Sequence, residues 1–258
     1  MPKQNNPYAA PSARVADAVP AGDDGTLIEG GQSVAAGRGW AWIKEGYALF
    51  RESPGTWVLI IFVMALILIA IGLVPYMDML SSLVVPVFTG GLLLGCRALA
   101  RGDELEFGYL FEGFRSHAKP LLLVGLLYLA GLVALGFIAA VVFGVGYFVG
   151  GEAAADSARE PLGFLLVVLI VVALSIPLVM AVWFAPALVV FHEFGPLAAM
   201  KQSFSGCLRN IPAFLVYGLI GMLLAILASI PAMLGWLVLG PVFTGSLYAS
   251  YRDIFLKS

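Results

Sequence analysis

The sequence predicts an all-α fold: a polytopic membrane protein with six transmembrane helices in three hairpins, each preceded by a cytoplasmic amphipathic helix at the membrane interface. Apolar residues make up 61% of the 258 positions and charged residues only 12%, whereas a soluble domain carries about 25% charged residues. Six apolar stretches reach the length of about 20 residues that a membrane-spanning helix needs. Of the 14 Lys and Arg residues, all except Arg159 fall on one side of these stretches, as they do in cytoplasmic loops.

The predicted spans are residues 55–75, 79–99, 120–149, 162–191, 211–229 and 231–251. The first external connection carries only Asp78 and the fifth-to-sixth connection carries no charge, so both are expected to be tight turns. The third-to-fourth connection, Gly150–Glu160, is expected to be a short acidic loop on the same side. This topology places both termini in the cytoplasm and the chain in a bacterial inner (plasma) membrane.

Residues 1–38 are expected to form a disordered cytoplasmic tail, and residues 39–258 a single membrane domain. The tail is rich in Ala, Pro, Gly, Asp and Ser and contains no apolar run. Such a segment cannot bury enough surface to offset the entropy lost on ordering. It also lacks the apolar core of a cleaved signal peptide.

Three segments on the cytoplasmic side carry apolar residues at helical spacing. These residues are Trp40, Ile43, Tyr47 and Phe50 in the first, Phe107, Leu110, Phe111 and Phe114 in the second, and Leu197, Met200, Phe204 and Leu208 in the third. Spacings of i, i+3, i+4 and i+7 predict amphipathic helices. Aromatic side chains mixed with basic ones are typical of helices at the lipid–water interface.

An internal repeat relates the second span to the sixth. The sequence Pro-Val-Phe-Thr-Gly occurs at residues 86–90 and again at 241–245, and the match extends to Arg97 and Arg252. Both spans run from outside to inside, so we expect a parallel repeat of about residues 40–100 and 197–255, related by an axis along the membrane normal.

Several of these motifs resemble a proteobacterial family of multi-pass inner-membrane proteins. They are the Asn-Pro-Tyr motif at residues 6–8 with the Ala-Ala-Pro that follows it, Gly-Arg-Gly-Trp at 37–40, and the repeated Pro-Val-Phe-Thr-Gly. The stretches 183–190 and 199–204 also resemble, more weakly, the membrane region attached to some glycerophosphodiester phosphodiesterases. The catalytic part of those enzymes is a separate soluble barrel, which this chain is too short to contain. The resemblance therefore implies a fold and a location, and no reaction.

The repeat supplies the candidate site residues Pro86, Thr89, Gly90, Pro241, Thr244 and Gly245. Each proline removes a backbone donor and frees the carbonyl four residues earlier, and each threonine places a hydroxyl near that break. Two interpretations stand side by side. The kinked helices line a substrate site, as in transporters with broken helices, or the kinks serve helix packing alone.

Basic residues on the cytoplasmic side are candidate contacts for anionic lipid headgroups, although the same residues also set the topology. They are Arg97, Arg101, Arg115, Lys119, Lys201 and Arg209. The expected partners are the lipid bilayer and a further protein or a second copy of the chain. The small-residue motifs at Gly91/Gly95 and Gly146/Gly150 suit either packing within the bundle or dimerisation. No nucleic-acid partner is expected.

No enzyme is predicted, because the spans contain no nucleophile with a base and no set of metal ligands; no cofactor and no metal site are expected. The predicted function is that of a membrane scaffold or accessory protein, which uses the tail and the interfacial helices as contact surfaces. The alternative is a passive or lipid-handling transporter that uses the second and sixth spans. A cleft between these two spans favours the transporter, and changing both Thr89 and Thr244 to Val is then expected to abolish transport.

Overall fold

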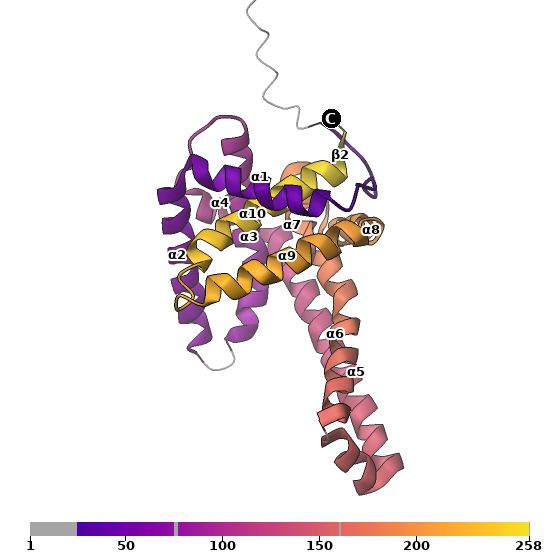
Figure 1. The fold of residues 1–258 in the computed structure, drawn as a ribbon. Coiled ribbons are helices and arrows are strands. Elements are labelled where there is room, and N and C mark those ends of the chain that lie inside the picture. Colours follow the sequence, from indigo (N-terminus) through magenta and orange to yellow (C-terminus); the bar gives the residue numbers. More distant parts are fainter. Residues whose placement is uncertain (1–24, 75–76, 160, 258) are drawn as a thin grey trace, which may run out of the picture.

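The computed structural model describes residues 25–74, 77–159 and 161–257, and these residues form an almost entirely helical protein (Figure 1). The helices are α1 (Arg38–Glu52), α2 (Pro54–Gly72), α3 (Asp78–Ala100), α4 (Tyr109–Ser116), α5 (Ala118–Arg159), α6 (Pro161–Trp183), α7 (Ala185–His192), α8 (Pro196–Arg209), α9 (Ile211–Ser229) and α10 (Trp236–Phe255). Two short strands, β1 (Thr26–Leu27) and β2 (Leu256–Lys257), pair antiparallel. The all-α class is confirmed for the described residues, and the three predicted amphipathic segments are helices α1, α4 and α8.

Five segments of the described chain are long and apolar enough to cross a membrane. They are Pro54–Gly72, Met79–Ala100, Ala118–Val141, Leu169–His192 and Ile211–Ser229. These segments overlap the first five predicted spans. The sixth predicted span is not among them, because α10 begins only at Trp236 and ends in a polar sequence that includes Arg252 and Asp253. The count of six spans and the cytoplasmic position of the termini therefore stay predictions.

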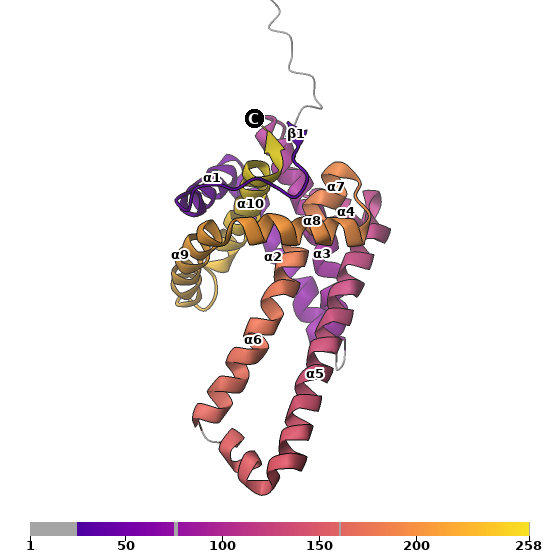
Figure 2. The same ribbon diagram turned by 90° about the vertical axis from the view of Figure 1, so that its right-hand side faces the viewer.

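The connection between the third and fourth spans differs from the loop that we expected. Residues 150–159 continue α5, which has 42 residues and bends back toward α6 at the far end of the hairpin (Figure 2). The cause lies in the four alanines among residues 153–158, since alanine has the highest helix propensity. In both views the α5–α6 hairpin projects from the other helices (Figures 1 and 2).

The fourth predicted span is interrupted at Phe184, between α6 and α7. The Ser203 hydroxyl of α8 enters this break: it donates a hydrogen bond to Met180 O (2.6 Å) and accepts one from Phe184 N (2.9 Å). Met180 O and Phe184 N are the acceptor and donor that would pair in an unbroken helix. Pro186, in the first turn of α7, has no amide hydrogen to continue the ladder.

Each amphipathic helix packs against a long helix from the adjacent part of the bundle: α1 against α10, α4 against α3, and α8 against α6. Figure 1 shows α1 lying along α10 at one end of the molecule. The apolar face of each amphipathic helix is accordingly covered by protein only in part, and Leu197 and Leu208 of α8 remain 71% and 51% exposed. In α1, Trp42, Ile43 and Phe50 are buried, while Trp40 and Tyr47 remain 45% and 50% exposed.

Two of these helix contacts bring backbone against backbone at a glycine. A Cβ atom on Gly113 of α4 would overlap Val87 O and lie 3.1 Å from Gly91 N in α3. A Cβ atom on Gly46 of α1 would overlap Val242 O of α10 in the same way. Val87 and Val242 are the corresponding residues of the two Pro-Val-Phe-Thr-Gly sequences. An amphipathic helix therefore packs against each copy of the motif at the same position.

The expected disordered tail is structured from Gly25 onward, which corrects its predicted boundary at residue 38. Residues 25–34, which we call the strap, cross from the C-terminus of the chain to α8. Its hydrogen bonds include Ile28 N to Phe255 O (2.7 Å), Gln32 N to Ile254 O (2.8 Å), Val34 N to Asn210 Oδ1 (2.8 Å) and Arg209 Nη1 to Gly31 O (2.7 Å). Composition did not reveal the strap because it is held largely by hydrogen bonds to residues distant in the chain, and only Leu27 and Val34 add apolar packing against the core. Residues 1–24, with the Asn-Pro-Tyr motif, lie outside the described residues.

Candidate functional site

A cavity of about 620 Å³ lies between the two helices that carry the Pro-Val-Phe-Thr-Gly sequences. Its lining comes from α3, from the junction of α6 and α7, and from α9 and α10. The lining residues are Val85, Pro86, Thr89, Val182, Trp183, Pro186, Tyr217, Gly218, Gly221, Met222, Ala225, Phe243, Thr244 and Leu247. We call this cavity the groove. The groove is a cleft between the second and sixth predicted spans. Such a cleft is the feature that favours a transporter over a scaffold.

The structure brings three of the six candidate residues together in the groove: Pro86, Thr89 and Thr244. Pro241 is buried inside α10 and is not part of the lining. The two glycines serve helix packing instead. A Cβ atom on Gly90 would lie 2.8 Å from a methyl group of Leu121, and one on Gly245 would lie 2.8 Å from the Cα atom of Gly46.

The two threonine hydroxyls are already engaged within their own helices. Thr89 Oγ1 donates to Val85 O (2.9 Å), and Thr244 Oγ1 donates to Gly240 O (3.0 Å). Each hydroxyl has one proton to donate, so neither offers it to a ligand in this conformation. The groove therefore presents a mainly apolar wall of aliphatic and aromatic side chains.

A second cavity, of about 340 Å³, continues the groove past Trp183 toward α5. It shares Val85, Pro86, Val182 and Trp183 with the groove and adds Ser81, Ser82, Tyr128 and Val179. The indole nitrogen of Trp183 is buried and has no hydrogen-bond partner among the described residues. The two cavities together make an elongated apolar space with Trp183 in its wall.

The rim of the groove reaches the outer surface of the helices. Val85 is 41% exposed and Met222 is 54% exposed, and both lie in segments able to cross a membrane. In a bilayer, lipid tails surround such a surface. A molecule can therefore enter the groove from the side, without crossing the protein interior.

Sequence reasoning missed most of the groove. Trp183 and Pro186 entered only as part of the stretch 183–190 that resembles the phosphodiesterase-linked membrane region, and Tyr217, Gly218 and Phe243 were not considered as site residues. Gly218 and Gly221, three positions apart in α9, offered the only signal, because small residues in a membrane helix mark close approach or open space. A Cβ atom on Gly218 would meet nothing within 4 Å, which identifies open space.

The six basic candidates for lipid contact do not form one site. Arg97, Arg101 and Arg115 line a cavity of about 490 Å³ beside α4, together with the acidic residues Asp103, Glu106 and Glu112. The Arg97 guanidinium lies 4.7 Å from the centroid of the Phe191 ring. Lys119 and Lys201 are exposed, and Arg209 bonds the strap.

The two cysteines are buried thiols. Burial raises the pKa of Cys207 to about 12, and a hydrogen bond with Ser203 opposes part of that rise. A thiol with so high a pKa stays protonated near neutral pH, and the protonated form is a poor nucleophile. Cys207 therefore acts as a packing residue of α8.

Comparison with known proteins places the chain among inner membrane proteins. It is 31% identical over 253 residues to a probable inner membrane protein of Burkholderia thailandensis, an alignment that covers 86% of this chain and 92% of the relative. No family model and no solved structure matches the chain. The resemblance to the phosphodiesterase-linked membrane region and the role of the Asn-Pro-Tyr motif thus stay predictions. With several helices able to cross a membrane, the chain is a multi-pass inner membrane protein and belongs to the family of this Burkholderia thailandensis protein.

Proposed function

We propose that this inner membrane protein handles lipid by holding an acyl chain in the groove between α3, α6, α9 and α10. The single observation that carries the proposal is the cavity of about 620 Å³ between the two copies of the Pro-Val-Phe-Thr-Gly motif. Its volume falls within the range of about 300–1,000 Å³ that is typical of small-ligand sites. The proposal adopts the lipid-handling alternative to the scaffold.

The chemistry of the lining supports an acyl chain over a polar solute. Thr89 and Thr244 donate their protons to their own helices, and the described lining contains no charged side chain. A polar solute would lose its hydrogen bonds to water without replacing them, at a cost of about 1–3 kcal/mol per group. An acyl chain has no hydrogen bonds to lose, and it exchanges dispersion contacts with neighbouring lipid tails for contacts with the aromatic walls.

The scaffold function has less support from the described residues. It required the apolar faces of the amphipathic helices as contact surfaces for lipid or protein. Those faces are only partly available, because Ile43, Leu110 and Met200 are buried, while Trp40, Tyr47, Leu197 and Leu208 remain exposed. The scaffold remains the competing function in the experiment that follows.

Filling the groove is expected to displace the lipid. In Gly218→Leu, the new side chain projects into the groove without a backbone clash, because a Cβ atom there meets nothing within 4 Å. Lipid retained through gentle extraction, measured by native mass spectrometry, is expected to fall about tenfold, as the isobutyl group replaces several acyl-chain contacts.

The matched control for this experiment is Gly136→Leu. Gly136 also lies in a membrane-capable helix with nothing within 4 Å of its Cβ position, but it is outside the groove. The control variant is expected to keep its lipid. Equal lipid retention by the two variants contradicts the proposal. An unmodified chain that carries a protein partner and no lipid supports the scaffold function instead.

The double change of Thr89 and Thr244 to Val separates an apolar ligand from a polar one. Valine keeps the shape of threonine, and the hydroxyls that it removes bond only to Val85 O and Gly240 O in the structure. We therefore expect bound lipid to change by less than about threefold in the same mass-spectrometric measurement. Complete loss of the ligand would restore the earlier expectation that these hydroxyls contact a polar substrate.

A further inference from the structure

The turn that joins α9 to α10 is apolar and exposed. Ile230, Met233 and Leu234 in this turn are 73%, 67% and 64% exposed. The sequence between Arg209 and Arg252 contains no Asp, Glu, Lys, Arg or His. A contiguous apolar surface is suited to contact with lipid or with a partner, and not to contact with water. The depth of the turn in a bilayer follows from the helices that hold it.

Helix α1 marks the level of the membrane surface at this end of the bundle. Lys44, Glu45, Arg51 and Glu52 of α1 are all exposed. A charged side chain is costly in the hydrocarbon core, so such residues lie among the headgroups or in water. Helix α1 therefore lies at the surface of the bilayer or above it, and depth can be counted from its contacts with α9 and α10.

Helix α10 extends only a short way from α1 toward the turn. A Cβ atom on Gly46 of α1 would overlap Val242 O and lie 2.6 Å from Ser246 N, so the two backbones touch there. Trp236, the first residue of α10, precedes Val242 by six positions. Six residues of α-helix extend about 9 Å, whereas the hydrocarbon core is about 30 Å thick.

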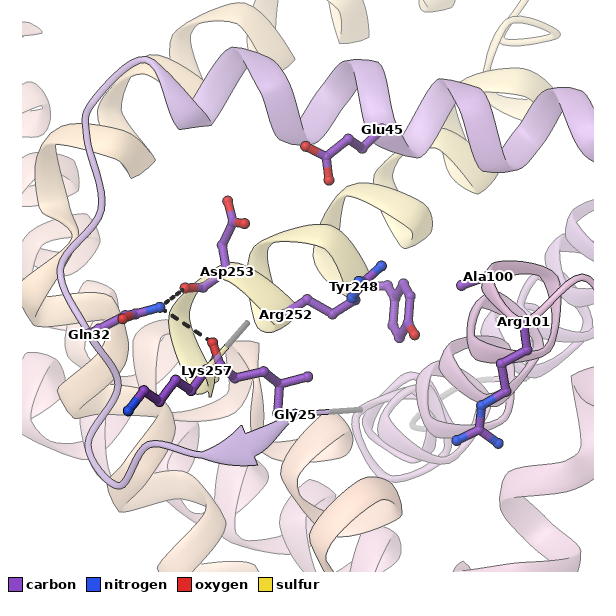
Figure 3. A pocket seen from close by; sticks show the side chains of 10 residues that line it. Gly25, Gln32, Glu45, Ala100, Arg101, Tyr248, Arg252, Asp253 and Lys257 are labelled. Atoms are coloured by element: carbon purple, nitrogen blue, oxygen red, sulfur yellow. Dashed lines mark hydrogen bonds between the residues drawn. The ribbon is translucent and has the colours of Figure 1, made fainter. Parts of the chain in front are cut away.

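The other end of α10 is polar and stays at the level of α1. Arg252 and Asp253 lie near the end of α10 and line one pocket with Glu45 of α1 and Gln32 of the strap (Figure 3). Asp253 Oδ2 pairs with Arg38 Nε of α1 (2.5 Å), and Gln32 Nε2 donates to Asp253 O (2.8 Å). These charges hold this end of α10 at the membrane surface, so only its first part enters the bilayer.

Helix α9 is also too short below α1 to carry the turn across a membrane. A Cβ atom on Gly39 of α1 would overlap Ala213 O and lie 2.8 Å from Tyr217 N. Ser229, the last residue of α9, follows Tyr217 by 12 positions, which correspond to about 18 Å of helix. The two helices together place the turn about 9–18 Å from α1, inside a hydrocarbon core of about 30 Å.

The packing of α10 against α2 agrees with this depth. A Cβ atom on Gly240 would lie 3.2 Å from Ile61 Cγ2, and Ile61 is the eighth of the 19 residues of α2. Helix α2 continues for 11 residues beyond that contact, whereas α10 begins only four residues before Gly240. In Figure 1 the turn between α9 and α10 accordingly lies beside α2 and short of its end.

The polar groups of the turn bond to one another. Its backbone hydrogen bonds include Ala232 N to Ile230 O (2.9 Å), Met233 N to Ser229 O (3.2 Å) and Leu234 N to Pro231 O (2.9 Å). A tryptophan near a turn usually marks the membrane–water interface. Here the Trp236 indole donates to Ser229 Oγ (3.0 Å), and Ser229 Oγ donates to Ala225 O (2.8 Å). Internal hydrogen bonds of this kind are what a turn in hydrocarbon requires.

We propose that α9 and α10 form a re-entrant hairpin, which enters the bilayer from the side of α1, turns within the hydrocarbon core and returns to the same side. Its exposed turn is a surface for the acyl chains of a single leaflet. A re-entrant hairpin replaces the external turn that the sequence led us to expect between the fifth and sixth spans. It holds whether or not the groove binds lipid.

The test measures from which side of the membrane the turn can be reached. Single cysteines are introduced into the full chain and treated with a membrane-impermeant maleimide in spheroplasts and in inverted membrane vesicles. Met233→Cys reports on the turn. Arg51→Cys in α1 and Ser157→Cys in the charged end of the α5–α6 hairpin report on the two sides. The native Cys96 and Cys207 are buried, and the unmodified chain supplies the background.

Met233→Cys is expected to react at least about tenfold more slowly than Arg51→Cys from either side, because a thiol in hydrocarbon does not form the reactive thiolate. It is expected to react fully after denaturation in sodium dodecyl sulfate. Reaction of Met233→Cys from the side that labels Ser157→Cys would show that the hairpin crosses the membrane. Reaction from the side that labels Arg51→Cys would place the turn at the surface. Either result overturns the proposal.

A second measurement gives the depth of the turn directly. A nitroxide attached to Met233→Cys in phosphatidylcholine bilayers is expected to collide several times more often with oxygen than with a water-soluble nickel chelate in electron paramagnetic resonance. The same label on Arg51→Cys is expected to show the reverse preference. Equal access of the nickel chelate to both labels contradicts the re-entrant hairpin.

Two further variants keep the outcome interpretable. Met233 has a positive φ of 64°, so if Met233→Cys does not fold, Ile230→Cys takes its place at a position with an ordinary helical backbone (φ −58°). Gly218→Leu combined with Met233→Cys is expected to leave the labelling unchanged. Failure of the groove and failure of the re-entrant hairpin can therefore be told apart.

Discussion

Replacing Gly113 with alanine is expected to destabilise the protein by about 3 kcal/mol or more, since overpacking of a tight contact costs about 1–3 kcal/mol and occasionally more. The new methyl group would overlap Val87 O and lie 3.1 Å from Gly91 N, so α4 must move away from α3. A backbone oxygen cannot move aside as a flexible side chain can. For a chain of this size, we expect the midpoint of thermal unfolding in detergent to fall by about 6–12 °C.

The control for this change lies in the same region. Gly108→Ala, at the N-cap of α4, adds the same methyl group where nothing lies within 4 Å, and its unfolding midpoint is expected to stay within about 2 °C of the unmodified value. Gly46→Ala, at the contact of α1 with α10, is expected to behave like Gly113→Ala. An unfolding midpoint for Gly113→Ala equal to that of Gly108→Ala would show that the two helices are not in close contact.

Replacing Asn210 with alanine is expected to cost about 3 kcal/mol, because several buried hydrogen bonds lose a partner and each such group costs about 1–3 kcal/mol. Asn210 is 1% exposed. Its side-chain amide donates to Gln32 O and Gly206 O and accepts from Val34 N, each at 2.8 Å. The expected readouts are a lower thermal midpoint and faster hydrogen exchange at the amides of the strap.

Truncations provide the comparison for Asn210→Ala. Removing residues 1–24 leaves every described hydrogen bond of the strap, so the thermal midpoint is expected to remain unchanged. Removing residues 1–36 deletes the strap and is expected to destabilise the protein at least as much as Asn210→Ala does. This differs from the expectation that residues 1–38 form a disordered tail. A stable chain without residues 1–36 would refute the role of the strap.

The sequence predicted the positions of most helices well and the ends of the helices less well. Apolar length located five membrane-capable helices, and helical spacing of aromatic residues located α1, α4 and α8. The prediction of a loop was wrong for residues 150–159, which are helical, because the alanines among the acidic residues have high helix propensity. The break at Phe184 escaped notice because it depends on Ser203, a residue in another helix.

Only three of the 14 residues that line the groove were among the candidates from the sequence. The repeated motif identified Pro86, Thr89 and Thr244, because two identical runs in two helices point to one shared environment. It did not distinguish these groove residues from Gly90 and Gly245, which pack against other helices. The side of a helix on which a residue lies follows from periodicity. Whether that side meets a neighbour or open space depends on helices that are distant in the chain.

The sequence by itself determined the class of the protein, its membrane location and its helices, because apolar length and periodicity are local properties of a chain. Only the tertiary structure decided where space is left between the helices and which charges meet. The groove brings Gly218 of α9, which leaves open space at its Cβ position, into one lining with Thr89 of α3 and Thr244 of α10. The ion pair of Arg38 with Asp253 exists because α1 returns to pack against α10.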